Sequence, residues 1–141
     1  MTSTRELQNR ALVLVVDDDP ELRATTAQLL SQEFEVLTAQ NGLEALELIA
    51  LREIDVVCTD YNMPGLDGIE LLRRVAASYP PIESILITGF REYAQRQMGS
   101  DDTFLLVVKP YNPETLIKII RRAVRSAQAN RTFAPLAKVV G

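Results

Sequence analysis

The stretch Ala11-Leu-Val-Leu-Val-Val-Asp-Asp-Asp-Pro20 places six apolar residues directly before three carboxylates. A short apolar run that is rich in β-branched residues is typical of a strand buried on both faces of a parallel sheet. Asp19 has the side chain of a helix N-cap, and Pro20 suits the first position of a helix. The stretch therefore predicts a buried strand that leads through an acidic turn into a helix.

The same pattern returns along the chain, with helical segments between the apolar runs. The further runs are Phe34-Glu-Val-Leu-Thr38, Ile54-Asp-Val-Val-Cys-Thr59, Ile82-Glu-Ser-Ile-Leu-Ile87 and Phe104-Leu-Leu-Val-Val108. Strands and helices that alternate predict an α/β fold with a doubly wound, five-stranded parallel sheet and helices on both faces. The expected strand order is the flavodoxin-like 2-1-3-4-5, in which strands 1 and 3 are neighbours.

One domain accounts for most of the 141 residues. Residues 11–129 carry the strand and helix patterns, residues 1–10 form a polar N-terminal extension, and residues 130–141 lack a period. We expect this last segment to be a C-terminal tail or the start of a linker. The fourth helix, expected over 91–98, is short and has few apolar residues. A loop over 99–102 follows it.

Polar residues stand at the end of four of the expected strands. Asp17 and Asp18 follow the first, Asp60 the third, Thr88 the fourth and Lys109 the fifth. Taken singly, each has a structural explanation as a cap, a loop residue or a surface acid. Because the carboxyl ends of parallel strands share one edge of the sheet, we expect all five to meet there. Three carboxylates beside a hydroxyl and an ammonium suit a cation and a phosphate.

Composition excludes several kinds of site. The chain has no histidine, so it holds no His–metal site, no catalytic Ser/His or Cys/His pair and no phosphohistidine of its own. Its one cysteine, Cys58, sits inside an apolar run and is expected to be a small buried residue. No apolar stretch is long enough to span a membrane, so the expected location is the cytoplasm.

Charge is distributed unevenly along the chain. Residues 112–141 hold six basic residues against one acidic residue, whereas the net charge of the whole chain is −4. The remainder is therefore strongly acidic. An acidic body argues against direct nucleic-acid binding by this domain.

Four motifs together resemble the receiver domain of two-component response regulators, the family of the chemotaxis response regulator. They are Val15-Val-Asp-Asp-Asp-Pro20, Asp60-Tyr-Asn-Met-Pro-Gly-Leu-Asp-Gly68, Ile87-Thr-Gly89 and Val108-Lys-Pro110. The second motif is the most specific, because an acid followed by this Met-Pro-Gly-x-Asp-Gly spacing is rarely accidental. The resemblance covers roughly residues 10–129.

The resemblance implies a role for each residue at the predicted edge. Asp60 would accept a phosphoryl group from a sensor histidine kinase or a phosphotransfer protein. Mg²⁺ would be bound by Asp60 with the Asp17/Asp18 pair, and the backbone carbonyl of Asn62 would be a further ligand. Thr88 would be the switch hydroxyl, Lys109 would contact the phosphate, and the Lys109–Pro110 bond would be cis. The change in conformation would control an output partner, which cannot be identified from these residues.

The chain departs from the family pattern at two places. The family commonly has an aromatic residue three positions before the lysine, where this chain has Leu106; the nearest aromatic residue is Phe104. The family's Gly-Ala pair usually lies nearer the lysine than Gly99-Ser100 does here, so the fourth helix is expected to be shortened. Many receivers use that face for partners, and a homodimer through the last helix and the fourth-helix face is one expected assembly.

Two other functions share features with this sequence. Haloacid-dehalogenase-like phosphatases also use a strand-end aspartate, Mg²⁺, Thr and Lys, and Asp17-x-Asp19 superficially fits their signature. They need an acidic pair after the lysine, however, and Glu114 is the one acid that follows Lys109. We therefore expect a phosphoacceptor and not a turnover enzyme. The other candidate is an interaction module that no longer signals by phosphate, which the intact cluster disfavours. The residues leave open whether the domain acts alone or within a longer protein.

Overall fold

A single parallel sheet of five strands organises the chain, in the predicted order β2-β1-β3-β4-β5. The computed structural model describes residues 10–140, with side chains for residues 10–132. The strands are β1 (Leu12–Val16), β2 (Glu35–Ala39), β3 (Val56–Asp60), β4 (Glu83–Thr88) and β5 (Leu105–Val108). The helices of the described part are α2 (Pro20–Leu30), α3 (Gly42–Leu51), α4 (Gly68–Ser78), α5 (Arg91–Gln97) and α6 (Pro113–Val140).

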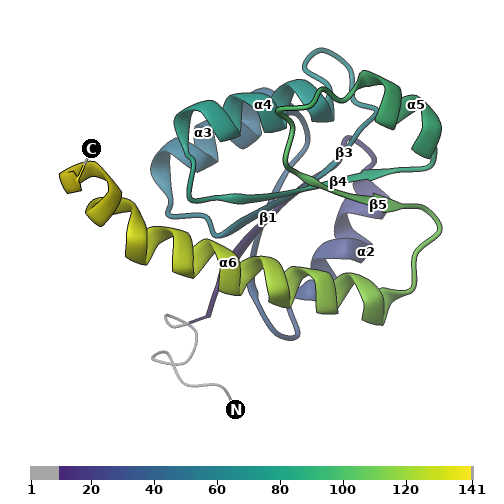
Figure 1. Ribbon diagram of the computed structural model, residues 1–141. Coiled ribbons are helices and arrows are strands. Elements are labelled where there is room, and N and C mark those ends of the chain that lie inside the picture. The colour runs from purple at the N-terminus through teal and green to yellow at the C-terminus, as the bar shows by residue number, and fades with distance from the viewer. Residues whose placement is uncertain (1–9, 141) are drawn as a thin grey trace.

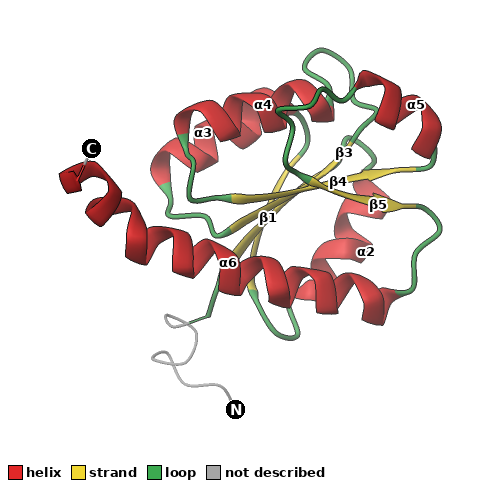
Figure 2. Ribbon diagram, viewed as in Figure 1, coloured by secondary structure: helices red, strands yellow, loops and turns green. Residues whose placement is uncertain are grey.

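Helices cover both faces of the sheet, as predicted. Helices α3, α4 and α5 lie on one face, and α2 and α6 lie on the other (Figures 1 and 2). Alternate residues of β1 point to the two layers: Leu12, Leu14 and Val16 belong to the core under the first group, and Val13 and Val15 to the core under the second. A strand buried on both faces needs a nearly continuous apolar sequence, which explains the runs.

Side chains cap the starts of four helices, and the cap predicted for the first of them, Asp19, is confirmed. Asp19 Oδ1 accepts a hydrogen bond from the Glu21 amide at 2.9 Å. Asn41 does the same for α3, Asp67 for α4 and Asn112 for α6, at 2.8, 2.9 and 2.8 Å. Each bond satisfies an amide that has no partner inside its helix. These caps determine where the chain leaves the turn after each strand.

Helix α6 is longer than the hydrophobic periodicity indicates. It continues to Val140, so residues 130–140, which lack a period, are helical. Polar anchors explain the difference: Asn130 Nδ2 donates to Glu83 Oε1 at 2.9 Å, and Arg131 binds the Asp55 carboxylate and the Ile54 carbonyl. The spacing of hydrophobic residues in the sequence does not indicate such polar contacts. The division into extension, domain and tail stays a prediction, and residues 1–9 lie outside the described part.

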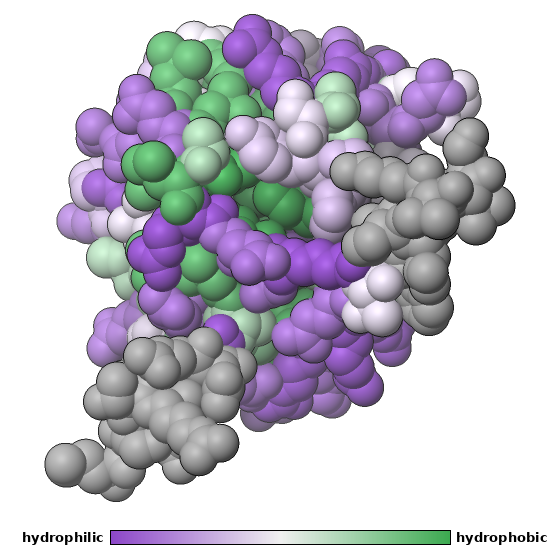
Figure 3. Space-filling model, turned by 90° about the vertical axis from the view of Figure 1, so that its left-hand side faces the viewer, coloured by the Kyte–Doolittle hydropathy of each residue, from purple (hydrophilic) through white to green (hydrophobic). Residues whose placement is uncertain are grey.

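Figure 3 views the molecule from the side on which α6 carries these anchors, where apolar residues lie among hydrophilic ones. A groove at this amino-terminal edge of the sheet is lined by Ile49, Ile54 and Ile82, with Arg131 also on its wall. Within residues 10–140, no helix is both long and apolar enough to cross a membrane. The strand-end polar residues lie at the opposite edge of the sheet.

Candidate functional site

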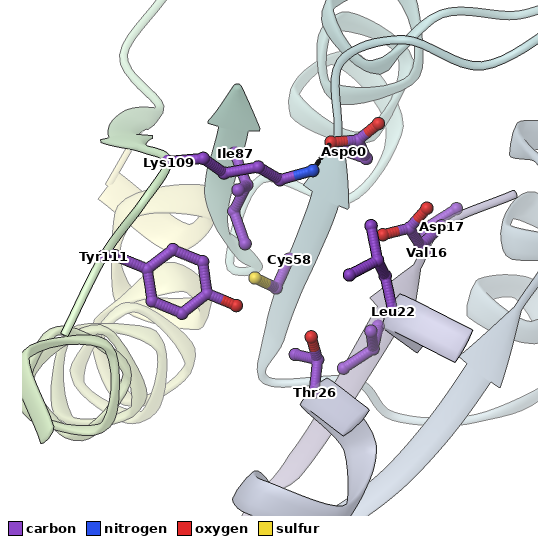
Figure 4. Close-up of a pocket in the computed structure, with 10 residues that line it drawn as sticks. Val16, Asp17, Leu22, Thr26, Cys58, Asp60, Ile87, Lys109 and Tyr111 are labelled. Carbon is purple, nitrogen blue, oxygen red and sulfur yellow. Dashed lines mark hydrogen bonds and ion pairs between the residues drawn. The ribbon is translucent and has the colours of Figure 1, made fainter. Parts of the chain in front are cut away.

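Asp60 is the last residue of β3, and Lys109 directly follows β5. The Lys109 ammonium donates a hydrogen bond to Asp60 Oδ1, with Nζ and Oδ1 2.8 Å apart (Figure 4). The Asp60 side chain is only 13% exposed, so this ion pair is shielded from water on most sides. The predicted meeting of these two side chains at the carboxyl edge is confirmed.

Gly68 brings the loop after β3 close to Asp60. Its amide donates to the Tyr61 carbonyl at 3.0 Å, and a Cβ atom at this position would lie 2.4 Å from the Asp60 carbonyl oxygen. No side chain fits at that distance, so a glycine is required for this close approach. The Met-Pro-Gly-x-Asp-Gly motif thus ends in a residue that packs directly against the phosphoacceptor candidate.

Three carboxylates meet at this edge. Oxygens of Asp17, Asp18 and Asp60 lie within 4.8 Å of one another. Asp17 is buried, and this burial together with the nearby Asp60 charge raises the pKa of its carboxyl group, although a hydrogen bond from the Asp19 amide opposes the shift. Burial and the repulsion between carboxylates both disfavour the ionised form of Asp17. A bound cation would favour the ionised form instead.

This set of donors fits a hard divalent cation. Mg²⁺ takes oxygen ligands and usually keeps several waters, so a few carboxylates on one side of the ion suffice. Asp18 is exposed and Asp60 is partly exposed, which leaves the cluster open to solvent ions. Asn62 stands two residues after Asp60 in the exposed part of the loop. The role of its backbone carbonyl stays a prediction.

Electrostatics tie Lys109 to the same carboxylates. Burial opposes the charged form of the ammonium, but the hydrogen bond to Asp60 and the charges of Asp60 and Asp17 outweigh it, so the pKa of Lys109 is raised. The lysine therefore stays protonated over the physiological range. Its backbone amide donates to the Thr88 carbonyl at 2.8 Å, and the bond to Pro110 is cis, as the resemblance implied.

Thr88 ends β4 and is 1% exposed. Its hydroxyl oxygen accepts a hydrogen bond from the Phe90 amide at 3.0 Å. In this structure the hydroxyl is therefore engaged with the residue that precedes α5. The strand-end position was predicted, whereas this partner was not, because the pattern of a strand does not show which way its last side chain turns.

A small cavity of about 30 Å³ lies beside the ion pair and opens between β1, β3 and α2 (Figure 4). Cys58 lines it, and burial together with the Asp17 and Asp60 charges raises the pKa of its thiol to about 12. The thiol is thus neutral, which agrees with the predicted role as a small buried residue. Leu22, Thr26 and Tyr111 also line the cavity.

Two residues near the site were not predicted from the sequence. Tyr111 lines the cavity and lies two positions after Lys109. Its closeness to that lysine in the sequence is the feature that could have predicted its place near the site. Arg23 donates from Nη1 to the Asp17 carbonyl at 2.8 Å and so holds the turn after β1. No motif marked Arg23, because its contact is with the backbone and depends on how α2 packs.

Comparison with known proteins supports the resemblance. Residues 13–121 match the response regulator receiver domain. The hydrogenase transcriptional regulatory protein HoxA of Cupriavidus necator is 34% identical over 119 residues, which make up 83% of this chain and 25% of HoxA. The sensor kinase CckA of Brucella abortus is 32% identical over 120 residues, 82% of this chain and 13% of CckA. The chain spans a quarter or less of these two relatives.

A solved structure agrees with the sequence relatives. The chemotaxis response regulator CheY4 of Vibrio cholerae is 33% identical, with a TM-score of 0.74 over 82% of this chain and 99% of that one. The strand order, the carboxylate cluster and the lysine at the end of β5 are thus accompanied by likeness along the whole domain. The chain belongs to the response regulator receiver domain family of two-component systems.

Proposed function

We propose that this domain accepts a phosphoryl group on Asp60, from a sensor histidine kinase or a phosphotransfer protein, and then changes conformation to control an output partner. The observation that carries the proposal is the Lys109–Asp60 contact of 2.8 Å beside the Asp17/Asp18 pair. A carboxylate so placed has a positive charge next to it and a cation-binding cluster behind it. Phosphoryl transfer depends mainly on such positioning and charge stabilisation.

In the transfer, one Asp60 oxygen forms a bond to phosphorus while the phosphorus–nitrogen bond of the donor phosphohistidine breaks. The imidazole leaves with the bonding electrons and takes up a proton. Lys109 would neutralise one phosphoryl oxygen, and the Thr88 hydroxyl would move toward another. Mg²⁺, held by Asp17, Asp18, Asp60 and the Asn62 carbonyl, would supply the remaining positive charge.

Partners follow from the class of the domain. HoxA is a transcriptional regulatory protein and CckA a sensor kinase, so the output proposed here is either a further domain of one polypeptide or a separate protein. We also propose a cytoplasmic location, no direct contact with nucleic acid, and a homodimer through α6 and α5 as one assembly. The domain assists its own phosphorylation and dephosphorylation without turning over a substrate.

Mass spectrometry tests the proposal. Incubation with a small phosphodonor and Mg²⁺ should add one phosphoryl group per chain, and Asp60→Asn should abolish the addition. Asp67→Asn is the matched control, because Asn caps α4 as well as Asp does and the change lies in the same loop. Phosphoryl uptake by Asp60→Asn would exclude Asp60 as the acceptor.

A further inference from the structure

Two contacts join the first turn of α5 to the candidate site. One is the hydrogen bond from the Phe90 amide to the Thr88 hydroxyl, at 3.0 Å. The other is a stacked aromatic pair, in which the rings of Tyr61 and Tyr93 have centroids 5.8 Å apart and planes 25° apart. Phe90, the residue before α5, makes no capping hydrogen bond with its side chain. The start of α5 therefore depends on contacts with the ends of β3 and β4.

Tyr61 is firmly connected to the phosphoacceptor. It directly follows Asp60, its amide donates to the Ile87 carbonyl at 2.9 Å, and its own carbonyl accepts from the Gly68 amide at 3.0 Å. Tyr61 as a whole is 6% exposed. Burial and the neighbouring Tyr93 raise the pKa of the Tyr61 hydroxyl. A ring held in this way follows any shift of the β3–β4 edge.

The other end of α5 is attached to α4. Arg73 donates from Nη2 to the Gln97 carbonyl and to Asp102 Oδ2, both at 2.9 Å. The same Asp102 oxygen accepts from the Gly99 amide at 2.7 Å, which closes the loop after the helix. The bond to the Gln97 carbonyl holds the last residue of the seven-residue helix, and the bonds to Asp102 fix the loop that follows it. Movement of α5 is therefore easiest at its N-terminal end.

Leu106 lacks the ring that the family commonly has at its position. It packs, partly buried, against the same core cluster that contains Tyr61 and Ala94 of α5. A leucine side chain offers no ring to exchange between two positions beside α5. The aromatic contact between the site and α5 is instead made by Tyr61 and Tyr93.

We propose that Tyr61 and Tyr93 are positioning residues that transmit the state of Asp60 to α5, which pivots about the Arg73–Asp102 contact. The inference rests on the proposed phosphorylation of Asp60. When the Thr88 hydroxyl turns toward a phosphoryl group, the Phe90 amide loses its acceptor. The stacked rings then keep α5 attached to the loop after β3, so the helix moves with that loop.

Amide exchange of the full chain tests this, with beryllofluoride and Mg²⁺ as the phosphoryl mimic. In the wild-type chain we expect the mimic to slow exchange across residues 91–97. Tyr93→Phe keeps the stacked ring and should keep that response, whereas Tyr93→Ala should lose it. Tyr93 is half exposed, so Tyr93→Ala should leave the fold intact. If Tyr93→Ala does not fold, Tyr93→Leu, which keeps apolar bulk without the ring, replaces it in the test and should also lose the response.

Phosphorylation of Asp60 is measured in the same variants by mass. Tyr93→Ala should still take up one phosphoryl group, which separates this inference from the proposed function. A wild-type response in Tyr93→Ala, or an equal loss in Tyr93→Phe, would overturn the role of the stacked pair. Failure of the wild-type chain to bind the mimic would overturn the proposed function and this inference with it.

Discussion

Charge balance at Asp60 illustrates what individual residues contribute. Asp60 and Lys109 are 49 positions apart, yet their side chains form a hydrogen bond of 2.8 Å. One lysine does not neutralise three carboxylates, and the raised pKa of Asp17, caused first by burial, shows that its charged form is disfavoured. A cation bound at the three carboxylates would relieve this repulsion and so would stabilise the folded protein.

Replacing Asp18 with Ala should remove the effect of Mg²⁺ on stability. The proposed Mg²⁺ site exists only in the folded state, so at one hundred times its Kd the ion should stabilise the wild-type protein by about 2.7 kcal/mol. The variant should lose this increase in Tm, while without metal it should be no less stable than wild type because one repulsive charge is gone. Thermal unfolding with and without Mg²⁺ measures both.

Asp101→Ala is the control for that experiment, because Asp101 is an exposed acid in the loop after α5. It should keep the full Mg²⁺ response. If Asp18→Ala responded to Mg²⁺ as strongly as the wild-type protein does, Asp18 would not be a ligand.

At the level of elements, polar contacts between distant segments hold the ends of helices α5 and α6. The Arg73–Asp102 pair holds the end of the short helix α5, and the Arg131–Asp55 pair holds α6 against the amino-terminal edge of the sheet. These polar pairs add to the apolar packing of the two helices, which places Ala94 of α5 in one core and Leu116 and Ile120 of α6 in the other. Each pair gives a separate prediction.

The Arg73–Asp102 contact should weaken in acid. The hydrogen bond from Arg73 lowers the pKa of the Asp102 carboxyl group below its usual value. Its contribution to stability is therefore complete above about pH 4, the range of an unfolded aspartate, and is lost as the pH falls through the lower folded-state value. The free energy of unfolding of Asp102→Asn should be lower than that of wild type at pH 7, and the difference should shrink below pH 4.

Urea unfolding at several pH values measures this difference. Asp101→Asn, one residue away on the exposed surface, should follow the wild-type curve throughout. A difference between Asp102→Asn and wild type that did not depend on pH would show that the ionised carboxylate is not what matters.

Arg131→Ala should destabilise the domain markedly. Asp55 is 5% exposed and also accepts from the Leu12 amide at 2.8 Å, so loss of the arginine leaves a buried carboxylate without its cation. Breaking a buried pair from one side costs about 3 kcal/mol. Arg125→Ala, at an exposed position of the same helix, should stay within about 0.5 kcal/mol of wild type.

Chemical denaturation compares these variants. Adding Asp55→Asn to Arg131→Ala should recover part of the loss, since the unpaired charge is then gone. Equal stability of Arg131→Ala and Arg125→Ala would mean that the anchor of α6 contributes nothing.

At the scale of the whole molecule, the domain combines a reactive edge with an anchored edge at opposite ends of one sheet. Asp60, Thr88 and Lys109 lie at the carboxyl ends of the strands, whereas Arg131 contacts the segment before β3. A change at the first edge reaches the nearest helix, α5, while the second edge keeps α6 in place. This division suits a signalling domain better than a turnover enzyme.

Steady hydrolysis of a phosphomonoester should therefore be absent. With p-nitrophenyl phosphate and Mg²⁺ we expect no sustained release of nitrophenol, because Glu114 is the one acid after Lys109 and no acidic pair stands there as in the dehalogenase-like phosphatases. Absorbance at excess substrate measures the release, with Asp60→Asn as the blank. Many turnovers per chain that Asp60→Asn abolished would contradict the assignment as a phosphoacceptor.

Much of the fold and of the site could be predicted from the sequence because the relevant signals are local. Each buried strand needs a short apolar run, and side chains such as Asp19 and Asn41 mark the start of a helix by capping it. Parallel strands bring their carboxyl ends to one edge, so the strand pattern alone predicts that Asp60 and Lys109 lie close together. These predictions need only residues that are close to one another in the sequence.

Contacts between side chains from distant segments could not be predicted from the sequence and are seen only in the folded chain. The hydroxyl of Thr88 turns to Phe90, the ring of Tyr61 meets that of Tyr93, and Arg131 reaches Asp55 across 76 positions. No period or spacing marks such pairs, since each depends on the relative placement of two packed elements. The local pattern of residues thus accounts for the order of the strands and the chemistry of their ends. The packing of α5 and α6 accounts for the contacts that those ends make.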